Sequence, residues 1–308
     1  MTELDSANET KDYRSNSLGR LTLRRIFRQR SAIFGGTILL FLILIAIFAP
    51  VIAPFDPEEV LIGKEDIKKR EGPCVHIFGC DPEKPQHILG VDGNVRDQFS
   101  RLLFGSRYSL FIGFASVGFA IIVGTTIGAF AGYLGGWADN ISMRFMDVLL
   151  AFPSLLLAIA IVTVLGRGLQ NALLAIAIVS IPIYARVVRA SVLSVKQQEY
   201  VSASRALGAG HLHILFRRIL PNAIAPLIVQ GTLGIAEAIL SAAALSFLGL
   251  GAQPPTPEWG TMLGSERNQV FSAPHLVFFP GLAIMVTVLA FNLLGDGLRD
   301  AMDPRLKQ

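Results

Sequence analysis

Few residues of this 308-residue chain could do chemistry, and one group of them is the run Cys74-Val75-His76-Ile77-Phe78-Gly79-Cys80. Two thiols and an imidazole, with His87 further on, are the donor types that bind zinc. The spacing matches no usual zinc pattern, and an even pair of cysteines this close together forms a disulfide more simply. We expect Cys74 and Cys80 to be bonded to each other and no metal to be present. A metal site on Cys74, Cys80, His76 and His87, or two free thiols, are the alternatives.

Glu237 is the one acid inside a long apolar run, which begins at Pro221 and continues past the acid to about Leu250. A carboxylate in lipid is costly and by default marks a functional site. Glu237 is therefore a candidate for lining a solute path. The alternatives are a side chain that faces a wet cavity or pairs across a subunit interface, and small residues on the same run favour close helix packing. These small residues include Gly231, Gly234, Ala236, Ala238, Ser241, Ala242, Ala243 and Ala244.

The chain has no nucleotide-binding or hydrolytic motif. The only Gly-Lys pair, Gly63-Lys64, is followed by Glu65, so the G-x-x-x-x-G-K-[ST] phosphate loop is absent from the sequence. None of the five histidines lies well inside an apolar run, which disfavours an intramembrane hydrolase or a histidine proton relay. We expect no enzymatic activity and no cofactor. If ATP drives this protein, another chain binds it.

The composition predicts an all-α membrane protein. Hydrophobic residues make up 52% of the chain and charged residues only 16%, against about 25% in a typical globular domain. Crossing a bilayer as a helix takes about 20 apolar residues, and six uncharged runs are long enough. A soluble helical protein would need polar faces, which runs such as 38–51 lack. The six runs are 31–55, 108–138, 148–166, 168–185, 221–236 with its extension, and 276–295.

These runs divide the chain into an arm, an anchor, an outer segment and a core. The first run is too long for a signal peptide and has prolines where a cleavage site would be, so we expect it to remain as an anchor. Residues 19–30 alternate basic and apolar types, as in a helix lying on the inner membrane surface or a simple basic flank. The predicted parts are a cytosolic arm 1–30, a first transmembrane helix 31–55, an extracytoplasmic segment 56–106, a core 107–295 with five more helices and the loop 186–220, and a cytosolic tail 296–308.

The distribution of Lys and Arg predicts the orientation in the membrane. Six crossings put both termini on one side, and that side holds 17 of the 27 basic residues. Most of the other ten lie in the long outer segment, which counts less in the positive-inside rule. We therefore expect the chain to lie in the inner membrane with both termini in the cytosol. The net charge of +4 reflects this topology, so we expect no nucleic-acid partner.

The most informative polar stretch is the loop 186–220 between the fourth and fifth runs. Its charges are mostly basic, it carries the turn signal Gly208-Ala209-Gly210, and it closes on Leu220-Pro221. The composition suits two short helices around a glycine hinge, a form expected of a membrane protein that grips something in the cytosol. Pro153 and Pro182 lie inside the third and fourth runs and are expected to kink them or open local backbone sites.

The stretch EYVSASRALGAGHLHILFRRILPNAIAPLIVQGTLG resembles the cytosolic coupling loop of ABC importer permeases, with its E-A-A-x-x-x-G motif followed by Leu-Pro. The resemblance is to the second permease subunit of dipeptide and oligopeptide importers, and it covers about Arg20 to Leu306. Further matching stretches are LSFLGLGAQPPTPEWGTML, MRFMDVLLAFPSLLLAIA, LGVDGNVRDQFSRLLFGSRYSL and GDGLRDAMDPRL.

Some positions depart from the family pattern. The E-A-A positions read Ser202-Ala203-Ser204, with Glu199 one turn earlier. Many relatives have a Glu shortly before L-S-F-L-G-L-G, where this chain has Ala242 and carries its acid at Glu237 instead. The stretch 74–86 also looks like an insertion. These departures bear on coupling and substrate.

The resemblance implies the type I ABC importer permease fold and a set of partners. A second homologous permease would complete the translocation path, two cytosolic ABC ATPase subunits would bind ATP, and an extracytoplasmic binding protein would deliver a peptide. The loop residues Ser202, Ala203, Ser204 and Gly208 would sit in a groove of the ATPase. Glu199, Leu220 and Pro221 belong to the same coupling element.

Other classes of function are weaker interpretations. A secondary transporter needs coupling-ion ligands within its spans, for which Glu237 alone is thin support. A receptor or scaffold needs no glycine-hinged cytosolic loop. Among ABC importers, those for glutathione, nickel chelates and oligosaccharides use the same branch of permeases and remain alternatives to a peptide importer.

Overall fold

The computed structural model describes residues 28–302, and within this range the chain is helical with only isolated β-bridges between loop residues. The predicted cytosolic arm up to residue 27, which holds most of the candidate surface helix 19–30, and the last six residues of the tail lie outside this range. The helices are α2 (Arg30–Ile52), η1 (His76–Phe78), α3 (Gln98–Leu134), α4 (Gly136–Leu150), α5 (Ser154–Leu165), α6 (Leu169–Lys196), α7 (Glu199–Ala206), α8 (His211–Ile214), η2 (Leu215–Ile219), α9 (Leu220–Phe247), α10 (Trp259–Glu266), η3 (Arg267–Gln269) and α11 (His275–Met302).

Five helical stretches are long and apolar enough to cross a membrane. They correspond to α2, α3, α6, the continuous run from α8 to α9, and α11. α3 starts at Gln98, ten residues before the predicted second span, so the end of the outer segment is the first part of this helix. α6 runs to Lys196 and therefore takes in the first residues of the predicted coupling loop.

The third predicted span is a broken one. α4 and α5 together pass the test for a span but meet at an angle of 91°. α4 begins at Gly136, twelve residues before the predicted start, and the break falls at Phe152-Pro153. Proline has no N–H to donate and disfavours a helical conformation at the residue before it. The kink expected at Pro153 is thus confirmed, and the helix before it starts earlier than the predicted residue 148. Counted as one span, the bent pair brings the number of crossings to six. α6, by contrast, continues through Pro182.

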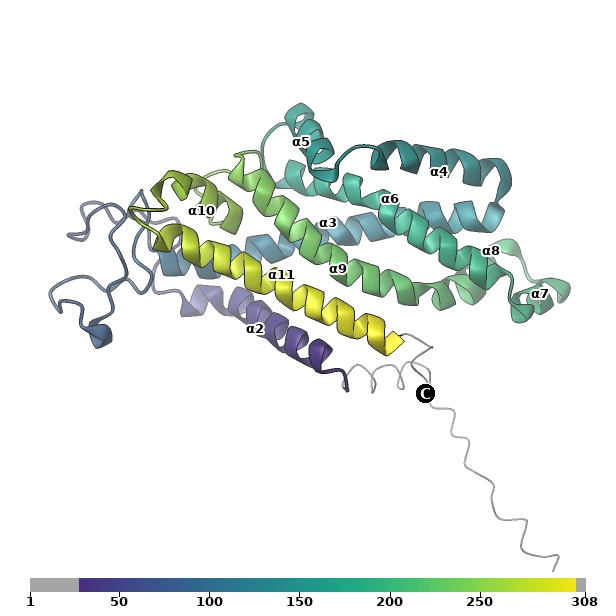
Figure 1. Cartoon of the computed structure of the whole chain (residues 1–308), viewed down its shortest axis with the longest axis horizontal. Helices are drawn as coiled ribbons and strands as arrows, with labels where there is room; N and C mark the ends of the chain where they lie inside the picture. The colour runs from purple at the N-terminus through teal and green to yellow at the C-terminus, as the bar shows by residue number, and fades with distance from the viewer. Residues whose placement is uncertain (1–27, 303–308) are drawn as a thin grey trace, which may run out of the picture.

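The main core lies where α3, α6 and α9 pack on one another. A methyl group on Gly128 of α3 would overlap the backbone of Ala185 in α6, so only glycine lets the two helices approach this closely. Tyr184 of α6 is almost fully buried in the same core. α4 lies along α6, on the side of it away from α11 (Figure 1).

α2 and α11 lie side by side along one edge of the molecule (Figure 1). Added methyl groups on Gly35 and Gly297 would overlap the backbones of Ala290 and Ala32 respectively. The start of α2 therefore meets the end of α11. This is the arrangement that an even number of crossings requires.

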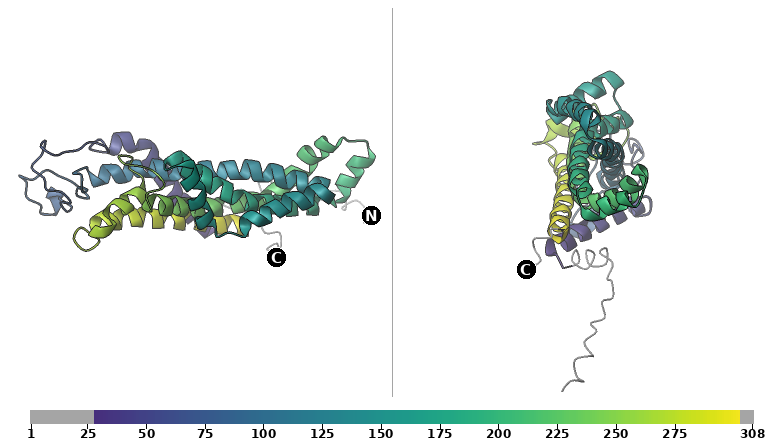
Figure 2. Two further views of the ribbon diagram at one scale, coloured as in Figure 1. Left: turned by 90° about the horizontal axis from the view of Figure 1, so that it is seen from above. Right: turned by 90° about the vertical axis from the view of Figure 1, so that its right-hand side faces the viewer.

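The outer segment caps the end of the bundle opposite α7, and in a second view it extends beyond the helices (Figures 1 and 2). It is held to the bundle by polar contacts. Arg70 Nε donates to Glu266 at the end of α10 at 2.8 Å, and the Gly93 amide donates to the same carboxylate at 2.9 Å. Asp97 caps α3 by accepting from the Ser100 amide at 2.7 Å. The segment is thus tied to both α10 and α3.

Candidate functional site: the coupling loop and the mid-membrane cavity

The loop between α6 and α9 contains the two predicted short helices with a glycine turn between them. α7 ends in a left-handed turn at Gly208, whose φ is +79°. The Gly208 amide donates to the Arg205 carbonyl at 3.0 Å and the Ala209 amide to the Ser204 carbonyl at 3.1 Å. This pair of bonds is a Schellman motif, which glycine forms without strain. The second helix, α8, runs on through the π-helical turn η2 into α9.

α7 presents one face to solvent and the other to the bundle. Val201 is fully buried in the main core, whereas Ser202 and Ala203 are exposed and Glu199 lies in the exposed first turn. Leu207 at the tip of the loop is 87% exposed. An exposed leucine beside small residues is what a protein partner with an apolar groove would cover.

Hydrogen bonds connect α7 to the start of α9. The Tyr200 hydroxyl donates to the Arg218 carbonyl at 3.1 Å, and the Asn222 amide donates to the Tyr200 hydroxyl at 3.0 Å. Leu220 and Pro221 are the first two residues of α9, where the missing proline N–H costs little. These bonds hold α7 against the start of α9.

A second connection joins the loop to α3 and α6. The Tyr133 hydroxyl, in the last turn of α3, forms a 2.9 Å hydrogen bond with Nδ1 of His211 in α8. Lys196 Nζ, at the end of α6, donates to the Tyr133 carbonyl. None of these three residues belongs to a motif of the sequence. Each lies at a helix end predicted on the cytosolic side, but no local pattern indicates that they meet.

Glu237 lines a small cavity between three helices. α5 contributes Ser154, α6 contributes Ser180, and α9 contributes Ser241 beside the acid. Glu237 lies ten residues, or about 15 Å, from the end of α9 nearest α10. Ser154 and Ser180 lie far from Glu237 in sequence, so no local pattern groups them with the acid, whereas Ser241 lies one helical turn after it on the same run.

Two further acids, Asp139 and Asp147, lie in α4 before the predicted start of the third span at residue 148. Asp139 forms an ion pair with Arg189, and Asp147 forms one with Arg186, so both bind arginines of α6. Within residues 28–302 no such partner is found for the Glu237 carboxylate. Unlike Asp139 and Asp147, Glu237 lines a cavity.

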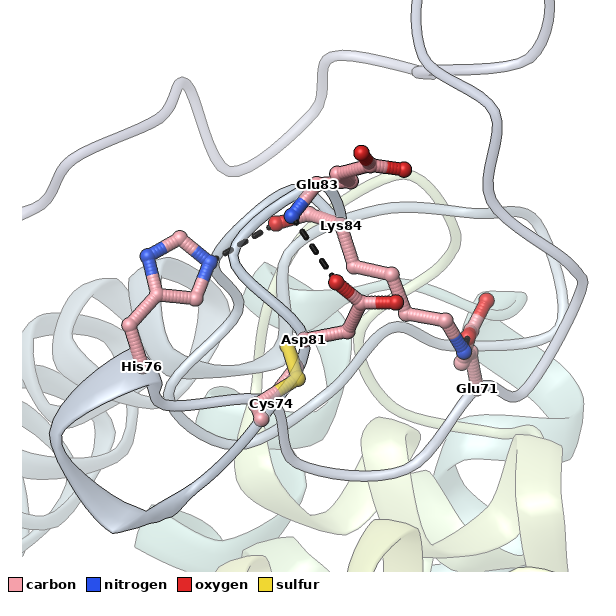
Figure 3. The surroundings of a disulfide bond; sticks show 7 residues. Glu71, Cys74, His76, Asp81, Glu83 and Lys84 are labelled. Carbon is pink, nitrogen blue, oxygen red and sulfur yellow. Dashed lines mark hydrogen bonds and ion pairs between the residues drawn. A yellow bond between two sulfur atoms is a disulfide. The ribbon is translucent and has the colours of Figure 1, made fainter.

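The cysteines lie in the outer segment as expected, and the structure joins their sulfur atoms (Figure 3). Their Cα atoms are 5.4 Å apart, within the usual range for a disulfide. The histidines of the alternative metal site are engaged elsewhere: His76 Nε2 lies 2.8 Å from the Lys84 carbonyl. No cluster of three metal-binding side chains is found among the described residues.

His87 lies between two carboxylates in the outer segment. Its Nδ1 is 2.7 Å from Asp97 and its Nε2 is 3.0 Å from Glu65. The ring is almost completely buried and stacks on Phe55. Burial alone would lower the pKa of His87, but the hydrogen bonds to Asp97 and Glu65 outweigh it and raise the pKa. Because Asp97 also caps α3, this charged contact links the outer segment to the helix bundle.

These features define an integral membrane transport subunit with a protruding loop at one end and a covered opposite end. The comparisons identify its family. A model of the binding-protein-dependent transport system inner membrane component matches residues 124–308, and one of the N-terminal transmembrane domain of oligopeptide transport permease C matches residues 17–73. The chain belongs to this family and is a transmembrane permease subunit of an ABC importer.

Several relatives align over nearly the whole chain. The chain is 47% identical to the dipeptide transport system permease protein DppC of Alkalihalophilus pseudofirmus, over 99% of this chain and 96% of the relative. It is 49% identical to the glutathione transport system permease protein GsiD of Pectobacterium atrosepticum, over 92% and 90%. It is also 49% identical to the di/tripeptide transport system permease protein DppC of Pseudomonas aeruginosa, over 91% and 90%.

The fold is also found in a solved transporter structure. The MetNI methionine ABC transporter in an inward-facing conformation aligns with a TM-score of 0.54, covering 67% of this chain and 98% of that chain at 19% identity. At this identity the likeness concerns the fold alone. It supports the type I importer permease fold that the sequence predicted.

Proposed function

We propose that this chain is a permease subunit of an importer of short peptides. The observation that carries the proposal is the match at 47–49% identity to permeases named for dipeptide and di/tripeptide transport. The match to the oligopeptide permease C model at residues 17–73 supports it, because this part holds the anchor and the start of the outer segment rather than the shared core.

The partners follow from the importer class. A second, homologous permease completes the translocation path, and two cytosolic ATPase subunits bind the ATP that drives transport. An extracytoplasmic binding protein delivers the substrate. α7 with the exposed Leu207 is the element that docks on an ATPase subunit, and the bonds through Tyr200 and Tyr133 carry its movement to α9 and α3. Transport then proceeds by rocking of packed helices between two arrangements.

The orientation completes the proposal. Both termini and α7 face the cytosol, and the outer segment with its two cysteines faces the other side of the inner membrane. The excess of Lys and Arg on the side of the termini supports this orientation, and a disulfide suits an oxidising compartment. Glu237 belongs to the surface along which the substrate passes.

The proposal is tested by rebuilding the importer in vesicles. The chain is purified with its second permease and its two ATPase subunits, and the cognate binding protein is added with labelled dipeptides, tripeptides or longer peptides. We expect ATP-dependent uptake of at least one peptide class. An assembly that hydrolyses ATP in response to its binding protein but imports none of these peptides would refute peptide import.

Glutathione is the second candidate substrate, because the chain is 49% identical to a glutathione permease. Glutathione is itself a modified tripeptide, so the same vesicles distinguish the two. Uptake of glutathione in preference to ordinary di- and tripeptides would favour this alternative.

A further inference from the structure

We propose that Glu237 and the serine hydroxyls around it form a subsite for a primary ammonium group in the translocation path. The natural occupant is the protonated amino terminus of a peptide. This inference rests on the proposed import of peptides and names the part of the peptide that the membrane path recognises.

The cavity has the size and lining that an ammonium group needs. Its volume is about 30 Å³, enough for one water molecule or a group of similar size. Ser154, Ser180 and Ser241 surround Glu237 from three helices. Ser180 donates its own hydrogen to the Ile176 carbonyl at 2.8 Å, which leaves its oxygen free to accept. An ammonium group has three donors and no acceptor, so it complements a carboxylate and hydroxyl oxygens.

The second step is that Glu237 has no ion-pair partner among the described residues. An ionised carboxylate at this depth requires a counterion or water, since its removal from water is expensive. Asp139 and Asp147 meet that requirement with arginines of α6. Glu237 has no such partner among residues 28–302, and its side chain is exposed on the isolated subunit. The carboxyl group is thus accessible to a solute that passes this surface.

The break between α4 and α5 places non-helical backbone beside the same cavity. Ser154, which lines the cavity with Glu237, is the first residue of α5 after the break. Non-helical backbone inside a membrane is tolerated only where protein covers it or where it faces a water-filled cavity. The start of α5 brings a partial charge of about +0.5, which is smaller than the full negative charge of Glu237. The site therefore remains negative overall.

The local potential can be measured without any transported substrate. Ser241→Cys places a thiol beside Glu237, and its reaction with a cationic and an anionic methanethiosulfonate is timed in the assembled transporter, with the unsubstituted chain as the blank. We expect the cationic reagent to be favoured, and the preference to fall about tenfold when Glu237→Gln is added. Glu237→Asp should retain it. An equal preference with and without the carboxylate, or no reaction with either reagent, would overturn the proposal.

Transport assays then show whether the bound ammonium group is the amino terminus of a peptide or a lysine side chain. Three peptides are compared at equal occupancy of the binding protein: one with a free amino terminus and no lysine, its N-acetylated form, and an N-acetylated peptide with one lysine. We expect Glu237→Gln to reduce the uptake of the first relative to the second, while Glu237→Asp leaves the ratio unchanged. A selective loss of the third instead would assign the subsite to lysine side chains.

The ammonium subsite and the proposed import of peptides can be refuted independently of each other. If the wild-type importer takes up no peptide, peptide import is wrong, and the thiol measurement still decides whether the site is cation-selective. If peptides are imported but Glu237→Gln lowers all three equally, the ammonium subsite is wrong. Poor assembly of that variant alone, with Glu237→Asp assembling normally and showing no cation preference at the introduced thiol, would make Glu237 a packing residue.

Discussion

The hydroxyl of Tyr133 and Nδ1 of His211 form a 2.9 Å hydrogen bond between the last turn of α3 and the first residue of α8. Their rings also meet edge to face, with centroids 5.9 Å apart. Seventy-eight positions separate the two residues. The bond is a direct link between the loop proposed to contact the ATPase and the end of α3.

Removing only this bond should loosen the loop. Tyr133→Phe keeps the ring and its contacts but deletes the hydroxyl, at a cost of about 1 kcal/mol in the docking of α8. We expect more ATP hydrolysed for each substrate imported, because movement of the ATPase is passed on less completely. The measurement is the ratio of ATP hydrolysis to uptake in vesicles. Tyr200→Phe, which cuts the separate link to Arg218, serves as a comparison.

Gly208 should be sensitive to backbone conformation rather than to size. No atom lies within 4 Å of a methyl group placed there, but its φ of +79° is unfavourable for other residues, most of all for β-branched ones. Gly208→Val should therefore cost about 1–3 kcal/mol of strain and disturb the end of α7. Gly208→Asn, which tolerates this conformation, should remain close to wild type.

The expected readout for Gly208 is association with the ATPase subunits. Gly208→Val should copurify with less ATPase or uncouple hydrolysis from uptake, while its size-exclusion profile shows that the membrane helices remain folded. Equal ATPase binding and equal coupling in the Val and Asn variants would contradict the role assigned to the turn.

Cys74 and Cys80 should be oxidised to each other in the mature protein. Mass spectrometry after alkylation should find both blocked until reductant is added. Cys74→Ser is the control, because it leaves Cys80 as a thiol that should react without reductant. Closing this short loop should stabilise the outer segment by about 2 kcal/mol. Alkylation of both cysteines in the unreduced wild-type protein would show them to be free thiols, and copurified zinc would favour the metal site.

The contact of His87 should make the outer segment more stable at acid pH. Hydrogen bonds to Asp97 and Glu65 raise the pKa of His87 above its ordinary value of 6.5 despite burial. A group with a raised pKa in the folded state adds its full stability below pH 6.5 and loses it as the pH rises through the folded value. Thermal unfolding at about pH 5.5 and about pH 8.5 measures this contribution.

His87→Gln supplies the control for the pH measurement. Glutamine can still hydrogen-bond to one carboxylate but carries no charge at either pH. We expect the variant to lose the part of the stability that the wild-type protein gains on acidification, while other titrating groups contribute equally to both. The same pH dependence in both proteins would rule out His87 as its source.

Much of this molecule could be predicted from local sequence. The six apolar runs predicted the helices because a bilayer requires about 20 apolar residues for each crossing, whatever the neighbours. Gly208 indicated a turn because a positive φ is a property of a single residue. Pro153 indicated a disturbance of the third span, since a missing N–H acts on the helix that contains it. The family motifs likewise follow from short stretches, and the comparisons confirmed the family.

The size of the break at Pro153 and the contacts that form the site required the tertiary structure. Ser154, Ser180 and Ser241 surround Glu237 only because α5, α6 and α9 pack together after a 91° bend. Tyr133 and His211 meet only because the close approach of α3 to α6 brings distant helix ends together. A hydropathy pattern specifies which segments enter the membrane and where they turn. It does not specify which faces meet, because that is decided by side-chain packing between residues far apart in the chain.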